Sequence, residues 1–155
     1  MQPYHIKKSN ELAVNFLRRL NRDLYCGSAP MRAEFALSPS TDFADCKSLD
    51  YQSITPGTIW GRLWQTGWFR FRGKFIPAPE TGCEPLIKIS TGSELLLYSP
   101  QGKALTGLTA FCWFEDDFIR DIYHPEESAA QPGEEFVLFG AVTANALAGD
   151  RKSVV

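Results

Sequence analysis

The segment from Trp60 to Ile76, WGRLWQTGWFRFRGKFI, constrains the fold most because its side chains alternate between two faces. Phe69, Phe71 and Phe75 fall on one face of an extended chain, and Trp68, Arg70, Arg72 and Lys74 fall on the other. A period of two is typical of a half-buried β-strand, whereas a helix would spread the phenylalanines around its circumference. Prolines at 77 and 79 end the strand. We therefore expect a long strand with an aromatic core on one side.

Several shorter segments also have the pattern of strands. They are Ala33–Leu37, Ser48–Ile54, Pro85–Ser90, Glu94–Tyr98, Lys103–Leu108 and Glu135–Ala144. The intervening SPQG at 99–102 predicts a hairpin turn. We expect a loop or irregular strand over Thr109–His124 and a polar loop over Pro125–Gly133. Closely spaced strands with no helix between most of them favour an antiparallel β-sandwich over alternating β and α units.

An amphipathic helix is predicted near the N-terminus, over residues 9–25. Its apolar residues recur at helical spacing, at Leu12, Phe16, Leu17, Leu20 and Leu24. Ser9 or Asn10 is expected to cap its start, and Gly27 to end it in the left-handed conformation. The apolar face needs a partner, either the side of the sheet or a domain outside this chain. The expected organisation is a helical lead-in at 1–28, a β-sandwich at 29–148 and a frayed tail at 149–155.

Composition narrows the classes of partner and compartment. The 155 residues suit one domain, and the net charge of −2 gives no basic footprint for nucleic acid or a membrane surface. The N-terminus lacks the apolar run of a secretion signal, so we expect a cytoplasmic protein. Four scattered cysteines without a CxxC pair are expected to be buried or idle thiols, with no disulfide needed and no metal site.

One cluster of acids resembles a catalytic or metal site. It consists of Glu115, Asp116, Asp117 and Asp121, followed by His124. Paired carboxylates can act as acid and base in glycosidic hydrolysis. The competing interpretation is a solvated edge with Arg120 as counter-charge, and it is favoured because surface acids far outnumber catalytic ones. We therefore assign no catalytic residue and no metal ligand.

The aromatic entry to the central strand offers a possible carbohydrate platform. Trp60, Trp64 and Trp68 beside Arg70 would let rings stack on a pyranose while polar neighbours bond its hydroxyl groups. The alternative is that these tryptophans belong to the core or to an interface between domains, since tryptophan is on average highly buried. Both interpretations stay open at this stage.

The order of these motifs resembles the N-terminal domain of glycoside hydrolase family 38 α-mannosidases. The matching runs are TPGTIWGRLWQTGWFRFRGKFIPAP, KISTG, SELLLYSPQGKALTGLT and PGEEFVLFGAVTAN, and the likeness covers about Leu12–Asn145. A similar order occurs in the jelly-roll sugar-binding domain of β-galactosidase-like enzymes. The turn Ser99–Gly102 departs from the family's Asp-Gly or Asn-Gly type, and Phe111–Tyr123 is longer and more aromatic.

The resemblance implies a mainly β chain, an antiparallel galactose-binding-like jelly roll with an N-terminal amphipathic helix. It further implies a non-catalytic domain that packs against and supports a catalytic domain of the same polypeptide, or that joins a homo-oligomer. The zinc ligands and catalytic aspartate of the family lie in that later domain, so no cofactor is expected here. The parent protein is then a zinc-dependent α-mannosidase. The alternative function is a free-standing carbohydrate-binding module, and a small hydrolase using Glu115, Asp116 or Asp117 ranks last.

Overall fold

The structure, a computed structural model, describes residues 3–77, 82–109, 119–126 and 131–145, with side chains at all of these except 3–6 and 21–23. Two helices and eight strands lie in these ranges. In chain order they are α1 Pro3–Asp23, β1 Arg32–Leu37, α2 Phe43–Cys46, β2 Gln52–Ile54, β3 Thr66–Lys74, β4 Ile87–Lys88, β5 Glu94–Tyr98, β6 Ala104–Thr109, β7 Ile122–Tyr123 and β8 Glu135–Thr143.

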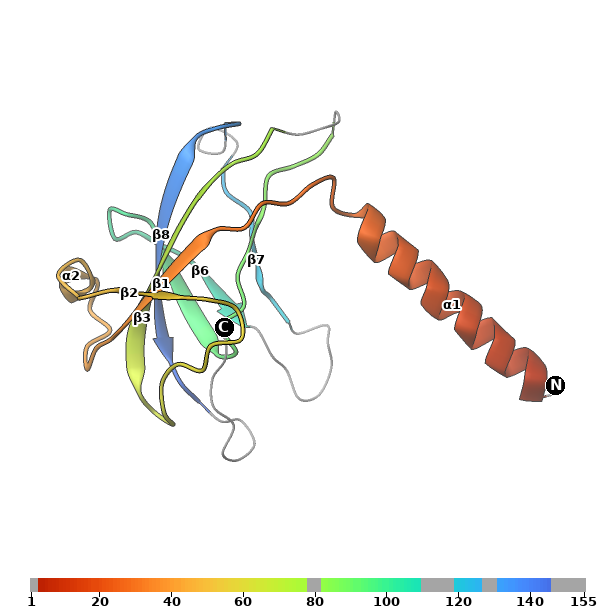
Figure 1. Cartoon of the computed structure of the whole chain (residues 1–155), viewed down its shortest axis with the longest axis horizontal. Coiled ribbons are helices and arrows are strands. Elements are labelled where there is room, and N and C mark those ends of the chain that lie inside the picture. The colour runs from red at the N-terminus through yellow and green to blue at the C-terminus, as the bar shows by residue number, and fades with distance from the viewer. Residues whose placement is uncertain (1–2, 78–81, 110–118, 127–130, 146–155) are drawn as a thin grey trace.

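The strands form two antiparallel layers of unequal size (Figure 1). The larger sheet has the order β2-β1-β3-β8-β5-β6, and the smaller one pairs β4 with β7. β3 and β8 lie at the centre and pair along their whole length, from Thr66 opposite Thr143 to Lys74 opposite Glu135. The mainly β, antiparallel sandwich expected from the sequence is confirmed.

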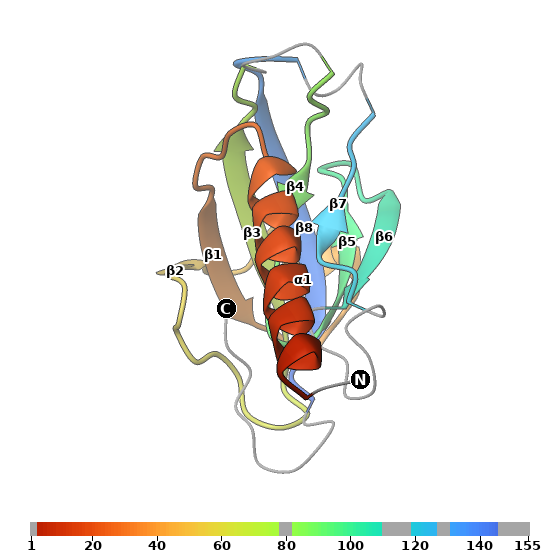
Figure 2. The same ribbon diagram turned by 90° about the vertical axis from the view of Figure 1, so that its right-hand side faces the viewer.

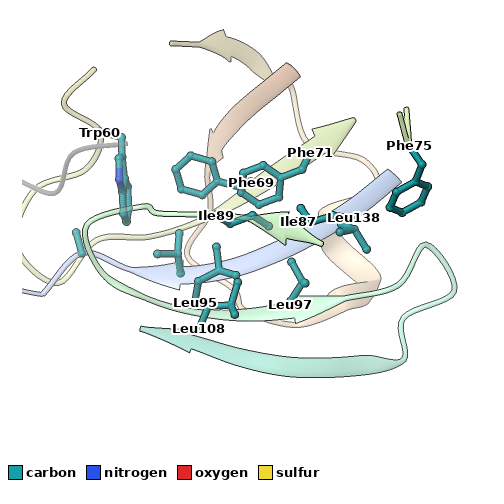
Figure 3. Packing of buried hydrophobic residues seen from close by; sticks show 12 residues of the cluster. Trp60, Phe69, Phe71, Phe75, Ile87, Ile89, Leu95, Leu97, Leu108 and Leu138 are labelled. Carbon is teal, nitrogen blue, oxygen red and sulfur yellow. The ribbon is translucent and has the colours of Figure 1, made fainter. Parts of the chain in front are cut away.

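An aromatic and aliphatic core fills the space between the two sheets (Figure 3). Phe69, Phe71 and Phe75 point into it, with exposed fractions of 0, 2 and 6%. Ile87 and Ile89 close the core from the β4 side. The alternation of the central strand therefore predicts its inner face correctly.

The opposite face of β3, which a half-buried strand would leave in solvent, is covered at its Trp68 end, in agreement with the interpretation of Trp68 as a core residue. Trp68 is fully buried, together with Phe139 of β8 and Cys46 of α2. Residues 43–46 form the short helix α2, which packs over this face, and the strand expected from Ser48 begins only at Gln52. Asp42 starts α2 by accepting a hydrogen bond from the Ala44 amide at 3.0 Å. Only the Arg72 and Lys74 end of this face remains exposed.

Glycines of the central strands make room for large side chains of their neighbours. A Cβ atom at Gly140 would lie 2.6 Å from Cδ1 of Leu95, and one at Gly67 would lie 2.6 Å from the ring of Phe35. Both distances are below van der Waals contact, so any larger residue would require Leu95 or Phe35 to move. These positions let the rings of β1 and β3 and the leucines of β5 interdigitate.

The predicted hairpin is confirmed, because β5 and β6 pair antiparallel across the turn at 99–102. Gly102 has φ 89°, a conformation that favours glycine, and a Cβ atom at this position would lie 2.6 Å from the ring of Phe43. The segment Pro85–Ser90 forms only the two-residue strand β4, and Ser48–Ile54 only β2. Of Thr109–His124, residues 110–118 lie outside the described part, and β7 follows them.

The N-terminal helix is longer than expected and begins earlier. α1 runs from Pro3 to Asp23, so neither Ser9 nor Asn10 caps it. Proline is favoured in a first turn because its missing N–H would be unpaired there. Gly27 does not end the helix; it has no positive φ and packs near Ile76. Figures 1 and 2 show α1 projecting outward from the side of the sandwich that carries β4 and β7.

A disulfide joins Cys26, just after α1, to Cys83, in the connection from β3 to β4. The expectation that all four cysteines are buried or idle thiols and that no disulfide is needed is wrong at this pair. Cys46 follows the expectation, being a buried free thiol. The spacing of 57 residues between Cys26 and Cys83 gives no sequence signal, because only the folded sheet brings the two Cα atoms to 6.5 Å.

Removal of this disulfide with Cys26→Ser and Cys83→Ser should lower the free energy of unfolding by up to about 4 kcal/mol, because the cross-link restricts the unfolded chain. Urea unfolding of the variant and of the wild type, with and without reductant, measures this. Reduced wild type should match the variant, and peptide mapping without reductant should recover the linked pair. Identical unfolding curves for oxidised and reduced wild type would contradict the cross-link.

Candidate functional site

The four residues proposed as a carbohydrate platform do not lie together. Trp60 and Trp68 are buried, with exposed fractions of 3% and 0%, on opposite sides of the main sheet. Arg70 is half-buried beside Trp68, whereas Trp64 is 71% exposed. The rings of Trp60 and Trp68 therefore have no free face for stacking on a ligand, and the interpretation in terms of core residues applies to these two. Trp64 alone keeps an accessible ring.

The two buried tryptophans hold loops by their indole N–H groups. Nε1 of Trp60 donates to the carbonyl of Thr91 at 2.9 Å, and its ring packs edge-on against Phe69. Nε1 of Trp68 donates to the carbonyl of Ser40 at 3.0 Å. A buried indole with its N–H bonded fixes the backbone it contacts. Trp68 thereby supports the 38–40 turn from beneath.

Arg70 belongs to an ion pair on the outer face of the sheet. Its Nε donates to Oε2 of Glu34 on the neighbouring strand β1 at 2.6 Å, and its guanidinium lies 4.3 Å from the ring centre of Tyr51. Nε of Arg72 lies 3.6 Å from the same carboxylate. The hydrogen bond from Arg70 lowers the pKa of Glu34, with further lowering from the charge of Arg72. Arg70 is therefore engaged within the chain. It links β3 to Glu34 of β1 and to Tyr51, the residue before β2.

A surface hollow of about 480 Å³ lies where β1 ends and β3 begins. The residues that line it are Leu37, Ser38, Pro39, Trp64, Gln65 and Thr66. Leu37 is 54% exposed and Trp64 71%, so the hollow offers solvent an aliphatic and an aromatic side chain. We take this hollow, here called the Trp64 hollow, as the candidate functional site.

Trp64 has the left-handed backbone conformation, with φ 67°, and is the one non-glycine residue with positive φ in the described ranges. This conformation costs an L-residue about 1–2 kcal/mol. Hydrogen bonds hold it there: the Trp64 amide donates to the carbonyl of Ala144 at 2.6 Å, and the Ala144 amide donates to the carbonyl of Gln65 at 2.8 Å. Gly61, with φ 63°, approaches Ala144 closely. The loop is therefore fixed to the end of β8, and its ring is displayed outward.

The polar side chains of the hollow already have partners within the chain. Ser38 donates to the carbonyl of Ser40 at 2.9 Å, and Thr66 donates to the carbonyl of Ser38. Oε1 of Gln65 accepts from the Arg62 amide at 2.6 Å. These hydrogen bonds fix the shape of the hollow. The side chains that it offers to a partner are the apolar ones of Leu37, Pro39 and Trp64. Such a surface suits an apolar side chain of a partner better than a ligand made mainly of hydroxyl groups.

The acidic cluster from the sequence is only partly within the described ranges. Glu115, Asp116 and Asp117 lie outside them. Asp121 pairs with Nζ of Lys88 at 3.4 Å, and Arg120 joins its strand to Thr109 by backbone hydrogen bonds. Among the described residues, no group of three or more His, Cys, Asp or Glu side chains is placed to hold a metal ion.

Sequence reasoning missed Leu37, Pro39 and the strained backbone of Trp64. By alternation Leu37 shares a strand face with Phe35, yet it is the last residue of β1 and its side chain is exposed. No local pattern predicts this, because the hollow arises from two segments 25 residues apart that the β1–β3 pairing brings side by side. The clustering of tryptophans was the available signal, and it falls in the loop that lines the hollow.

Glu34→Gln should lower the free energy of unfolding by about 1–2 kcal/mol at pH 7, because it removes a charged hydrogen-bond partner of Arg70. A carboxyl whose pKa is lowered on folding stabilises the fold above its unfolded pKa, and this contribution disappears as the pH falls through the folded value. The difference between wild type and variant should therefore shrink below about pH 4.3. Urea unfolding from pH 7 to 3 tests this, with Glu94→Gln on β5 as control. A difference that is constant with pH would contradict the assignment.

Comparison with known families gives a match over most of the chain, and no curated protein matches it. The family described as the alpha-mannosidase jelly-roll domain covers residues 30–155, which contain every strand of the described sandwich and the whole Trp64 hollow, and leave out α1. The match agrees with the antiparallel two-layer architecture and with the resemblance noted in the sequence. The chain belongs to the alpha-mannosidase jelly-roll domain family.

Proposed function

We propose that this chain is a non-catalytic N-terminal domain of an α-mannosidase-like glycoside hydrolase, which packs against and supports a catalytic domain. The observation that carries the proposal is the rigid display of Trp64 beside Ala144, where β8 ends. We assign no cofactor to this chain, and zinc to the catalytic domain. A homo-oligomer is a further possible assembly of the parent protein.

The Trp64 hollow has the features of a docking surface. Large aromatic residues contribute most of the binding energy at protein interfaces, and a rigid anchor loses little entropy on binding. Trp64 keeps a costly backbone conformation although its ring makes little contact with its own domain. Strain of this kind persists at sites where function requires it. An apolar anchor that is fixed before binding is what a neighbouring domain would use.

The position of the hollow suits a partner on the same polypeptide. In the family that the sequence resembles, the catalytic domain follows the sandwich in the chain. The amide and carbonyl of Ala144 bond to the Trp64 loop, so the polypeptide leaves β8 directly at the hollow. A domain joined on that side starts within reach of the exposed ring, and its high effective concentration would favour docking there.

The cytoplasmic location stays a prediction, and the disulfide bears on it. Disulfides are rare in reducing compartments and common in oxidising ones. The pair Cys26–Cys83 therefore counts against the cytoplasm unless the bond forms after release from it. Peptide mapping of the protein from its native source, with thiols blocked at lysis, separates the two locations.

In a polypeptide that holds both domains, Trp64→Ala should weaken the contact by about 2 kcal/mol or more, lowering the temperature at which mannosidase activity is lost. The matched control is Leu96→Ala, which truncates an exposed leucine on β5. In this chain alone, Trp64→Gly should be about 1 kcal/mol more stable than Trp64→Ala, because glycine adopts positive φ without strain. Equal thermal inactivation of the Trp64→Ala and Leu96→Ala proteins would contradict docking at the hollow.

The alternative, a free-standing carbohydrate-binding module, is favoured by one observation, the accessible ring of Trp64 at a hollow. Under our proposal, the chain should show no binding on a glycan array that Trp64→Ala abolishes. Binding that is lost in Trp64→Ala and kept in Leu96→Ala would establish the alternative. The reading frame beyond Val155 gives a second test, since a following zinc domain with an HxD motif supports the domain assignment.

A further inference from the structure

Helix α1 exposes its entire described apolar stripe to solvent. Phe16 is 64% exposed and Leu17 59%, and Leu12, Leu20 and Leu24 are also exposed. The helix has 21 residues and projects away from the sandwich in Figure 1, and Figure 2 shows it in front of the sandwich. Exposed apolar side chains at helical spacing mark a surface that is covered in use. The family match begins after the helix, at residue 30, so it assigns α1 no role.

The charge of the chain is divided unevenly between this helix and the rest. Residues 3–23 hold five Lys and Arg and two Asp and Glu, a formal charge of +3, whereas the whole chain has −2. The remainder therefore has −5. Lys7, Lys8, Arg18 and Arg19 all have exposed side chains. The small net charge that argued against an anionic surface is thus the sum of two larger charges of opposite sign.

The cations lie mainly away from the apolar stripe. At 100° per residue, Phe16 and Leu20 lie near the middle of the stripe and Arg18 and Lys7 lie on the opposite side. Lys8 and Arg19 lie at one edge of the stripe, next to Leu12. An apolar face of Phe and Leu, backed by a face rich in Lys and Arg, is typical of helices that lie in the plane of a membrane interface.

We propose that α1 binds an anionic lipid surface, with its axis parallel to the bilayer and its Leu12–Leu24 stripe inserted among the headgroups. Within the described ranges, no helix is both long and apolar enough to span a membrane, and the proposal requires insertion of one face only. The sandwich with its negative charge stays off the surface. The disulfide at Cys26 fixes the base of the helix to the body.

Charge distinguishes this partner from a second copy of the chain. Two copies of α1 paired along their stripes would bring two helices of charge +3 together, and this repulsion opposes pairing. A groove on another protein would contact the stripe and its edges and leave Arg18 in solvent. An anionic bilayer attracts every cation within about 8 Å of its surface, a distance similar to the thickness of a helix.

Vesicle co-sedimentation of the 155-residue chain tests the proposal. Vesicles of phosphatidylcholine with about 30% phosphatidylserine should bind about tenfold more chain than vesicles of pure phosphatidylcholine, and high salt should reduce the difference. Arg18→Glu with Arg19→Glu should reduce binding about tenfold, and Arg18→Lys with Arg19→Lys should retain it. Leu17→Asp with Leu20→Asp should abolish insertion.

A control with the same change of charge on the sandwich, Arg62→Glu with Lys103→Glu, should bind as the wild type does. All helix variants should keep the wild-type thermal midpoint, because the substituted side chains are exposed. Absence of binding to anionic vesicles, equal binding to neutral vesicles, or equal loss in the sandwich control would overturn the proposal. A dimer that Leu17→Asp dissociates, or a lowered midpoint in that variant, would also overturn it by assigning the stripe to a second copy or to the chain's own sandwich.

Discussion

The pairing of β3 with β1 on one side and β8 on the other is the constraint on which the rest of the structure depends. All nine residues of β3 are opposite a residue of β8, which fixes the register of the central sheet. A shift by one residue would exchange Phe69 and Phe71 with Trp68 and Arg70, placing a guanidinium in the core. The register therefore determines which side chains lie on each face of the sheet. The aromatic core lies within the sandwich, and the Arg70–Glu34 pair lies outside it.

The inner face of the sheet was predictable because a period of two needs only local sequence. The hairpin of β5 and β6 was predictable for the same reason, since its turn residues lie between its strands. The cover over Trp68 was not, because whether α2 folds back over the sheet depends on contacts of Phe43 with Tyr98 and Phe139, which are distant in sequence. The disulfide and the Trp64 hollow could not be predicted for the same reason, because each joins segments that only the folded sheet brings together.

Three tryptophans in one short segment have three different physical roles. Trp60 fills the space between sheets, Trp68 anchors the turn at Ser40 from the other face, and Trp64 alone faces solvent. Burial gives the first two a structural reason to be aromatic, but Trp64 has none, since its ring adds little to its own core and its backbone is strained. A residue that costs its domain stability and gains no packing from it is best explained by a contact outside that domain.

Helix α1 and the Trp64 hollow both expose apolar side chains to solvent, but they differ in rigidity, size and charge. Each exposes apolar surface, yet the hollow has a rigid ring at the end of β8, whereas α1 has a long stripe backed by cations. A rigid, small surface suits a partner of fixed shape, which under our proposal is the catalytic domain of the same polypeptide. A long amphipathic stripe with excess positive charge suits a partner that is extended, deformable and negative. If one partner covered both, it would have to match a neutral anchor and a basic helix together, so the separation of charge within the chain argues for two distinct contacts.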